Sequence, residues 1–336
     1  MASNSESPIL VTGGAGYIGS HMVLGLMEAG RNVVVVDDLS TGSKFLVPEG
    51  VPFVESKVGD RDRMSEVIRQ FQCETLMHFA GSVIVEESSR NPAKYHHNNF
   101  GESFALLETS LAEGVKHFIF SSSAAVYGEP DNVPIPESAP LRPVNPYGVT
   151  KLMTEWALRD LTEMSDMRYV ALRYFNVAGA DPQLRSGECA PVSSHLIKIA
   201  AETAAGKRPS ISIFGEDYPT PDGTCIRDYV HVCDLAAAHL SALEYLERGK
   251  ESVTLNCGYG RGYSVREVLD VVNSVVDRPI DVRSNVRRPG DPAELVADPS
   301  RIRDLVGWRP QNDDIELIVS SAIEWEKRLI SGGGES

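Results

Sequence analysis

Residues 9–19 read Ile9-Leu10-Val11-Thr12-Gly13-Gly14-Ala15-Gly16-Tyr17-Ile18-Gly19, an apolar run followed by glycines at positions 13, 16 and 19. At this spacing the first glycine permits a tight turn, the second lets the backbone approach a pyrophosphate, and the third lets a helix pack closely on a strand. The N–H groups of the first helical turn then face the anion. The stretch predicts a strand–turn–helix unit at the start of a doubly wound α/β fold.

The alternation of strand and helix continues through the first half of the chain. Short runs that are apolar on both faces are typical of a parallel sheet covered by helices on both sides. We expect strands at 9–11, 33–36, 53–55, 76–79, 117–120 and 169–172, and helices at 17–29, 61–71, 93–113 and 147–163. The predicted class is α/β, a doubly wound parallel sheet of the Rossmann type with a smaller mixed α/β lobe.

The second half of the chain has a less regular rhythm. Gly/Pro-bearing stretches at 181–191 and 215–223 flank a helix at 195–205, and a β-α-β pattern at 230–232, 235–246 and 253–256 is expected to return to the main sheet. The stretches 265–276, 281–283, 299–305 and 315–329 predict the small lobe. We therefore expect one domain over 8–178 with 229–258, and a second over 179–228 with 259–330.

Composition narrows the class of protein. With 32 Lys and Arg against 47 Asp and Glu, the net charge is −15, which argues against binding a nucleic-acid backbone. We find no apolar run long enough to span a membrane and no signal-peptide pattern at the start, and so expect a cytoplasmic protein. The odd number of cysteines, five, and the absence of C-x-x-C or H-E-x-x-H spacing favour reduced thiols and no metal site.

The end of the second predicted strand indicates which dinucleotide the turn would bind. The run 33–36 ends in Asp37, which is placed to accept the hydroxyls of an adenosine ribose. Asp37 and Asp38 would repel a 2′-phosphate, and no arginine immediately follows, so we predict NAD rather than NADP. The alternative is a glycine-rich turn with an acidic strand end that binds nothing.

Two further motifs suggest proton chemistry. Tyr147 and Lys151 are four residues apart, which places a phenol and an ammonium one above the other on a helix. A phenol must lose roughly 3 pKa units to act as a base near pH 7, and a nearby cation provides part of that shift. Ser123 ends the run that begins at 117, at the carboxyl end of a parallel strand, where ligands bind in such sheets. The alternative is a solvated helix face and a polar strand end.

Together these motifs resemble those of the UDP-glucose 4-epimerases, members of the extended short-chain dehydrogenase/reductase superfamily. The resemblance covers about 9–325 and includes Ser121-Ser122-Ser123-Ala124-Ala125-Val126-Tyr127-Gly128, Arg173-Tyr174-Phe175-Asn176, Asp217-Tyr218-Pro219-Thr220-Pro221-Asp222-Gly223-Thr224 and Arg227-Asp228-Tyr229-Val230-His231-Val232. It implies a tightly held NAD that removes a hydride from carbon 4 of a UDP-hexose and returns it to the opposite face of a transient 4-keto sugar.

The resemblance also implies roles for individual residues. Tyr147 would take the proton of the 4-hydroxyl, Ser123 would orient that hydroxyl, and Lys151 would hold the nicotinamide ribose and lower the pKa of the tyrosine. Cofactor contacts are implied for Gly13, Gly16, Tyr17, Ile18, Gly19, Asp37, Asp38, Ser40, Asp60, Phe79, Ala80, Asn99, Ser121, Tyr147, Lys151 and Tyr174. Substrate contacts are implied for Ser123, Asn176, Leu196, Phe214, Arg227, Tyr229, Arg288, Asp291 and Leu295.

The sequence departs from the family pattern at 83–86 and after Asn99, which leaves the local cofactor contacts open, and no cofactor lysine is carried over at 81–88. Leu295 would face the 2-position of the sugar, with a bulk between that of the tyrosine in strict enzymes and the cysteine or glycine in permissive ones. The bland alternative is that Leu295 packs the small lobe. Helices 93–113 and 147–163 resemble the pair that forms a dimer contact in relatives, so a homodimer is expected.

Rival functions remain open from the sequence. Sugar-nucleotide 4,6-dehydratases share the Tyr/Lys pair but carry an Asp-Glu pair just after the active-site Ser/Thr, where this chain has Ala124 and Ala125. UDP-glucuronate decarboxylases place a glutamate at the position of Ala125. A non-catalytic NAD sensor on the same scaffold would be favoured if Tyr147 or Lys151 were absent, and both are present.

Overall fold

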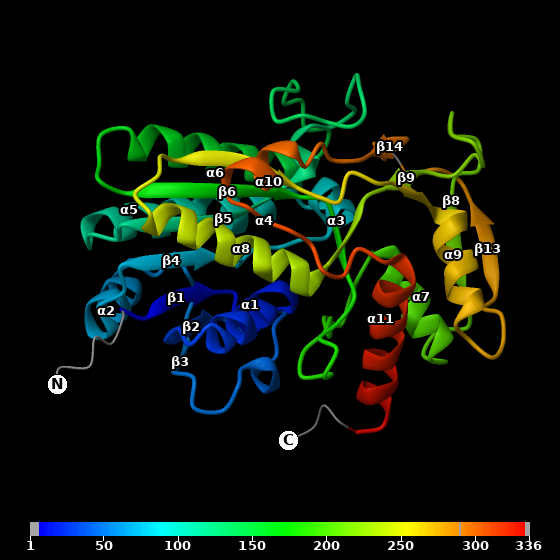
Figure 1. Ribbon diagram of the computed structural model, residues 1–336, viewed down its shortest axis with the longest axis horizontal. Coiled ribbons are helices and arrows are strands. Elements are labelled where there is room, and N and C mark those ends of the chain that lie inside the picture. Colours follow the sequence, from blue (N-terminus) through cyan, green and yellow to red (C-terminus); the bar gives the residue numbers. More distant parts are fainter. Residues whose placement is uncertain (1–6, 289, 333–336) are drawn as a thin grey trace.

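The computed structural model, which describes residues 7–288 and 290–332, is built around a seven-stranded parallel sheet (Figure 1). Its strands lie in the order β11 (Val253–Cys257), β6 (Arg168–Tyr174), β5 (His117–Ser123), β4 (Thr75–His78), β1 (Ile9–Thr12), β2 (Val33–Asp37) and β3 (Phe53–Glu55). Adjacent strands pair in parallel throughout. This confirms the predicted doubly wound α/β class.

Helices cover both faces of the sheet. On one face α1 (Tyr17–Glu28) packs beside α8 (Val232–Glu247), and on the other lie α2 (Arg61–Phe71), α5 (Glu102–Ala112) and α6 (Pro146–Thr162) (Figure 1). Alternate strand residues enter different cores: Ile9 and Val11 pack with the α1/α8 side, whereas Leu10 packs with the α2/α5/α6 side. Burial on both faces explains why these strands read as continuous apolar runs.

The long helix predicted over 93–113 is interrupted in the structure. A helix α3 (Val85–Arg90) precedes α4 (Pro92–Tyr95), a π-helical turn spans His96–Gly101, and α5 follows. The turn carries Asn99, whose side chain is buried and bonded to the backbone of Ser82. A single π-helical turn inside a helix is rare and often occurs at functional sites.

The smaller elements follow the mixed pattern that the sequence predicts. They comprise η1 (Lys44–Leu46), η3 (Ala124–Val126), α7 (Leu196–Ala204), β8 (Ile211–Phe214), β9 (Ile226–Arg227), β12 (Tyr263–Ser264), α9 (Val265–Ser274), β13 (Val282–Asn285), β14 (Glu294–Leu295), α10 (Ser300–Leu305) and α11 (Ile315–Ile330). β8 pairs in parallel with β13, and β9 lies between β12 and β14. In Figure 1 α7, β8, α9, β13 and α11 gather at one end of the sheet, with α7, α9 and α11 side by side.

One predicted return to the main sheet is wrong. Val230 and His231 of the stretch 230–232 lie in β10 (Tyr229–His231), which pairs in parallel with β7 (Asn176–Ala178) in a separate two-stranded sheet, and Val232 begins α8. The stretch 253–256 lies in β11 and does join the main sheet, beside β6. An apolar run specifies a buried strand but not the sheet that it joins, because pairing depends on tertiary neighbours. The division of the chain into two domains stays a prediction.

Over 7–288 and 290–332, every helix is too short or too polar to cross a lipid bilayer.

Candidate active site

The glycine turn has the geometry of a phosphate-binding turn. Gly13 has φ +71°, and a Cβ built there would lie 2.6 Å from the backbone nitrogen of Ala80. A Cβ on Gly19 would lie 2.1 Å from the carbonyl oxygen of Gly13, so the close packing of helix on turn requires glycine. Gly16 is the N-cap of α1 and provides no side-chain cap. The first N–H groups of α1 are therefore available to an anion, which fits a dinucleotide phosphate.

The carboxylate of Asp37 joins the end of β2 to this turn. One oxygen accepts a hydrogen bond from the N–H of Ala15 and the other from the N–H of Leu39, both at 2.9 Å. Asp37 is buried, and burial raises the pKa of its carboxyl. Asp38 accepts from the N–H of Ser40 at 2.9 Å. Asp37 and Asp38 thus lie where the adenosine ribose of a dinucleotide binds in this fold. Their negative charge favours NAD over NADP, because it would repel a 2′-phosphate.

Other predicted cofactor residues have partners within the chain. Both amide atoms of Asn99 are bonded to the backbone of Ser82 at 2.8 Å. Asp60 is exposed and caps α2 by accepting from the N–H of Arg63 at 3.1 Å. Tyr17, which with Ile18 opens α1, donates to the carbonyl of Gly179 at 2.6 Å. These contacts give each residue a structural role beside the predicted one.

The three predicted catalytic residues lie together at the carboxyl end of β5. Ser123 is the last residue of β5, Tyr147 lies in the first turn of α6, and Lys151 lies one turn further. The Ser123 hydroxyl is hydrogen-bonded to the Tyr147 phenol and accepts from the N–H of Ala125 at 3.2 Å. The ammonium of Lys151 is 5.8 Å from the centroid of the Tyr147 ring. All three side chains are buried, so the arrangement is shielded from water.

Burial dominates the electrostatics of this group. It raises the pKa of Tyr147, against which the hydrogen bond from Ser123 acts, and it lowers the pKa of Lys151 to about 8. The sequence predicts a lowered pKa for Tyr147. The protein's own side chains do not produce this lowering by themselves. Desolvation of the phenolate is the largest cause, and the hydrogen bond from Ser123 offsets only part of it.

Tyr174 and Phe79 continue the site from the ends of neighbouring strands. The phenol of Tyr174 is hydrogen-bonded to the hydroxyl of Ser121. The Phe79 ring lies 4.8 Å from the ring of His239 on α8, and the Tyr174 ring lies 6.3 Å from it. Phe79 and Tyr174 thus both lie close to the buried imidazole of His239.

The predicted substrate residues gather in the smaller elements. The guanidinium of Arg227 is buried and bonded to the carboxylate of Asp291 and, at 2.8 Å, to the carbonyl of Pro292. The guanidinium of Arg288 lies 4.0 Å from the centroid of the Phe214 ring. Two cations and an aromatic ring are the groups that a nucleoside diphosphate requires.

The remaining predicted substrate residues are linked by strand pairing. Asn176 of β7 is the register partner of Tyr229 of β10, and Leu295 of β14 is the register partner of Arg227 of β9. Leu295 also packs against the small core that contains Ala124, the residue after Ser123. Leu196 is the first residue of α7. Leu295 therefore has a packing role, which the alternative interpretation of this residue predicts, and it lies near Ala124, the residue that follows β5.

Residues 9–258 match the NAD dependent epimerase/dehydratase family. The chain belongs to this family. Its NAD dependence and its place among the epimerases, predicted from the motifs, are thereby confirmed.

UDP-glucose 4-epimerases from several organisms are similar to this chain over nearly its whole length. A UDP-glucose 4-epimerase of Azospirillum brasilense is 50% identical over 98% of this chain and 94% of its own length. The crystal structure of a UDP-glucose 4-epimerase from Brucella ovis in complex with NAD covers 96% of this chain and 99% of its own, at 41% identity and a TM-score of 0.93. A UDP-Glc/GlcNAc 4-epimerase structure from Campylobacter jejuni, 45% identical, covers 96% of this chain and 100% of its own, with a TM-score of 0.84.

The epimerase's predicted substrate region contains an ion pair that its sequence does not indicate. Arg287, next to Arg288, is bonded to the carboxylate of Asp217 at 2.5 Å and lies 4.1 Å from the centroid of the Tyr218 ring. In the sequence the Asp217–Thr224 segment is only a family motif, and nothing local indicates its partner. The pair ties this segment to the stretch after β13 that carries Arg288.

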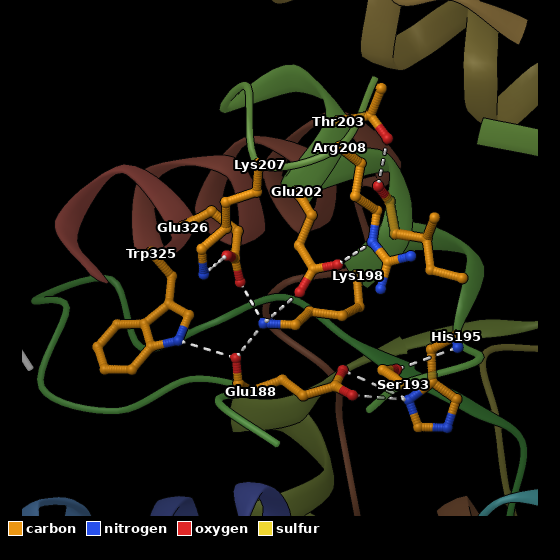
Figure 2. Close-up of polar contacts among 11 residues, drawn as sticks. Glu188, Ser193, His195, Lys198, Glu202, Thr203, Lys207, Arg208, Trp325 and Glu326 are labelled. Atoms are coloured by element: carbon orange, nitrogen blue, oxygen red, sulfur yellow. Dashed lines mark hydrogen bonds and ion pairs between the residues drawn. The ribbon is translucent and has the colours of Figure 1, made fainter. Parts of the chain in front are cut away.

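A second group missed from sequence lies around α7 (Figure 2). The buried ammonium of Lys198 is bonded to Glu326 of α11 and, at 2.6 Å, to the carbonyl of Glu188. The Glu188 carboxylate in turn meets His195 at 3.3 Å and holds the pKa of that imidazole above its ordinary value. Because His195 and Leu196 are adjacent, the cluster fixes the start of α7 in the epimerase's predicted substrate region.

Proposed function

We propose that the chain is a UDP-hexose 4-epimerase that interconverts UDP-galactose and UDP-glucose through a 4-keto intermediate. The observation that carries the proposal is the convergence of Ser123, Tyr147 and Lys151 at the carboxyl end of β5, at the same edge of the parallel sheet as the glycine turn that follows β1. NAD, when bound, supplies the acceptor and donor of the hydride at carbon 4. The protein's own side chains then have to transfer one proton and bind one anionic substrate.

The proton passes through Tyr147. Its phenolic oxygen accepts the proton of the sugar 4-hydroxyl as the hydride leaves carbon 4, and returns it when the hydride comes back. Ser123, already bonded to that phenol, orients the hydroxyl. Lys151 adds a positive charge near the phenolate and stabilises it.

The diphosphate is held by arginines. Arg227 and Arg288 are the donors that suit its charge, and Phe214, beneath Arg288, offers a flat face to the uracil ring. Because Arg227 is already paired with Asp291, the substrate meets a guanidinium whose orientation is fixed before binding. Asn176, Leu196, Tyr229 and Leu295 complete the proposed sugar and uridine contacts.

The residues after Ser123 disfavour dehydration. Ala124 and Ala125 form the 3₁₀ turn η3, and their methyl groups have no proton to exchange. A 4,6-dehydratase needs an added acid and base at these positions, so elimination of water lacks its groups here.

We also propose a cytoplasmic homodimer. Trp156 on α6 is 48% exposed, and Phe100 and Phe104 pack together, with ring centroids 5.7 Å apart, at the neighbouring helices. Large aromatic groups on an exposed helix pair suit a subunit contact. The five cysteines carry free thiols, as in proteins of a reducing compartment. Light scattering with size-exclusion chromatography tests the dimer, and Trp156→Glu is expected to give monomers.

Incubation with UDP-galactose, without added NAD, tests the activity. We expect UDP-glucose to appear until the two sugars reach equilibrium. Turnover that produces a 4-keto-6-deoxy sugar, or no turnover at all, would overturn the proposal.

A further inference from the structure

Glu155 lies one turn after Lys151 on α6 and is 5% exposed. Its carboxylate accepts from Arg173 of β6, at 2.9 Å from Nε and at 2.6 Å from a terminal nitrogen. It also accepts from the hydroxyl of Ser122. A buried carboxylate with three such bonds is fully paired and rigidly placed.

Ser122 is the middle residue of the triplet that ends β5. The side chains of the two serines beside it point away from the face of Ser122; Ser121 bonds to Tyr174, and Ser123 bonds to Tyr147 at the end of the strand. Successive side chains of a strand point to opposite faces, so anchoring Ser122 fixes the orientation of both neighbours. Glu155 therefore fixes the end of β5 from the face of the sheet toward which Ser122 points.

Arg173 extends this anchor into the surrounding structure. Its guanidinium donates to the phenol of Tyr127 at 3.0 Å, and that phenol donates to Asn256 of β11 at 2.6 Å. Asn256 in turn donates to the carbonyl of Ile135 at 2.7 Å. These hydrogen bonds join β5, β6, β11 and α6 on the Ser122 side of the serine triplet.

Glu155 is also the only carboxylate among the described residues shown to act on Lys151. The groups that face the ammonium are Glu155 and Tyr147 from α6, the ring of Phe120 and the carbonyl of Ser121 from β5, and His78 from β4. Burial keeps His78 neutral, with its pKa lowered to about 3. Glu155 is the one acidic side chain among these groups, and its carboxylate favours the protonated form of Lys151.

We propose that Glu155 is a positioning residue for the epimerase reaction: it fixes the serine triplet through Ser122 and acts on the ammonium of Lys151, one helical turn away. The proposal rests on the proposed function, because it assigns Ser123, Tyr147 and Lys151 to catalysis.

The test combines kinetics with the ionisation of Lys151, observed in protein labelled with ¹³C at lysine Cε and assigned with Lys151→Arg. In Glu155→Gln we expect kcat for UDP-galactose to fall about tenfold or more at pH 8, with KM changed less than about threefold. The Lys151 signal should titrate at a lower pH than in the unsubstituted protein. Asp160→Asn, which removes an exposed carboxylate from the same helix, should change neither quantity.

Two further variants separate the charge from the hydrogen bond. Glu155→Asp keeps the charge and should restore the Lys151 titration, whereas Ser122→Ala should lower kcat and leave that titration in place. If Glu155→Gln does not fold, Glu155→Asp and Ser122→Ala still test the proposal. Two results would overturn the proposal. The first is a Glu155→Gln variant in which both the Lys151 signal and kcat are unchanged. The second is an equal fall in kcat and Tm in Glu155→Asp and Ser122→Ala, with the same Lys151 titration in both variants. Failure of the proposed function is a distinct result, since the unsubstituted protein would then not convert UDP-galactose while the Lys151 titration remains measurable.

Discussion

The ammonium of Lys151 donates a 2.7 Å hydrogen bond to the backbone carbonyl of Ser121. The bond ties α6 to the end of β5, two residues before Ser123. The hydroxyl of the same serine is bonded to Tyr174, so Ser121 connects Lys151 to Tyr174. A cation anchored in this way has little freedom to leave the phenol, which makes its effect on Tyr147 testable by substitution.

Removal of the phenolic oxygen in Tyr147→Phe should lower kcat more than removal of the hydroxyl in Ser123→Ala. A positioned proton acceptor contributes about 10²- to 10⁴-fold, whereas Ser123 only orients the substrate. Steady-state rates for UDP-galactose measure both. An unchanged rate in Tyr147→Phe would remove the tyrosine from the mechanism.

Substitution of the cation in Lys151→Ala should shift the acidic limb of the pH–rate profile to higher pH. Without the positive charge, the phenolate of Tyr147 forms at higher pH, since burial already raises its pKa. A profile recorded from pH 6 to pH 10 gives the shift. If the profile stays in place while the rate falls, Lys151 has a binding role and no tuning role.

NAD should co-purify with the protein at close to one per chain, because a reaction that returns its hydride has no net demand for cofactor exchange. Gly13→Ala should lose most of it, since its Cβ would lie 2.6 Å from the nitrogen of Ala80. Gly30→Ala is the matched control: its φ of +74° is nearly that of Gly13, but nothing lies within 4 Å. NAD released by denaturation measures the content. Activity that rises in strict proportion to added NAD, with none released, would contradict retention.

Stability should fall as the pH drops from 6.5 towards 4. Burial lowers the pKa of His21, His231 and His239 to about 4 and that of His78 to about 3. Between these values and 6.5 the unfolded chain binds protons that the folded chain excludes, so the free energy of unfolding falls by up to about 1.4 kcal/mol per pH unit for each histidine. Urea unfolding at several pH values measures the slope.

The matched pair for this prediction is His239→Gln and His97→Gln. His239 is fully buried, whereas the side chain of His97 is 79% exposed. The slope should become shallower in the first variant and stay the same in the second. Equal slopes in both would mean that His239 is not kept neutral by the fold.

What the sequence predicts well here is local. The glycine spacing, the acidic end of β2 and the Tyr147/Lys151 pair each act within a few residues, where chain geometry is set by φ, ψ and helical periodicity. The pairing of β10 with β7 depends on neighbours brought in by the whole fold. The same holds for Glu155, because an acidic residue on a helix is ordinarily solvated, and its contact with Arg173 crosses from α6 to β6.

The bulk of Leu295 should set the tolerance for an N-acetyl group at the 2-position of the sugar. Its side chain is half-buried, next to Arg227 and against the core behind Ser123, so a smaller residue opens space towards the sugar and a larger one closes it. An apolar gate of this kind discriminates by about 1–3 kcal/mol, roughly a 5- to 150-fold ratio in kcat/KM. We expect UDP-glucose and UDP-galactose to be the main pair, with weak activity on their N-acetylated counterparts. This weak activity should rise in Leu295→Cys and vanish in Leu295→Tyr, as measured by kcat/KM for both substrate classes. If each substitution changes acetylated and plain substrates equally, Leu295 acts only by packing the small lobe.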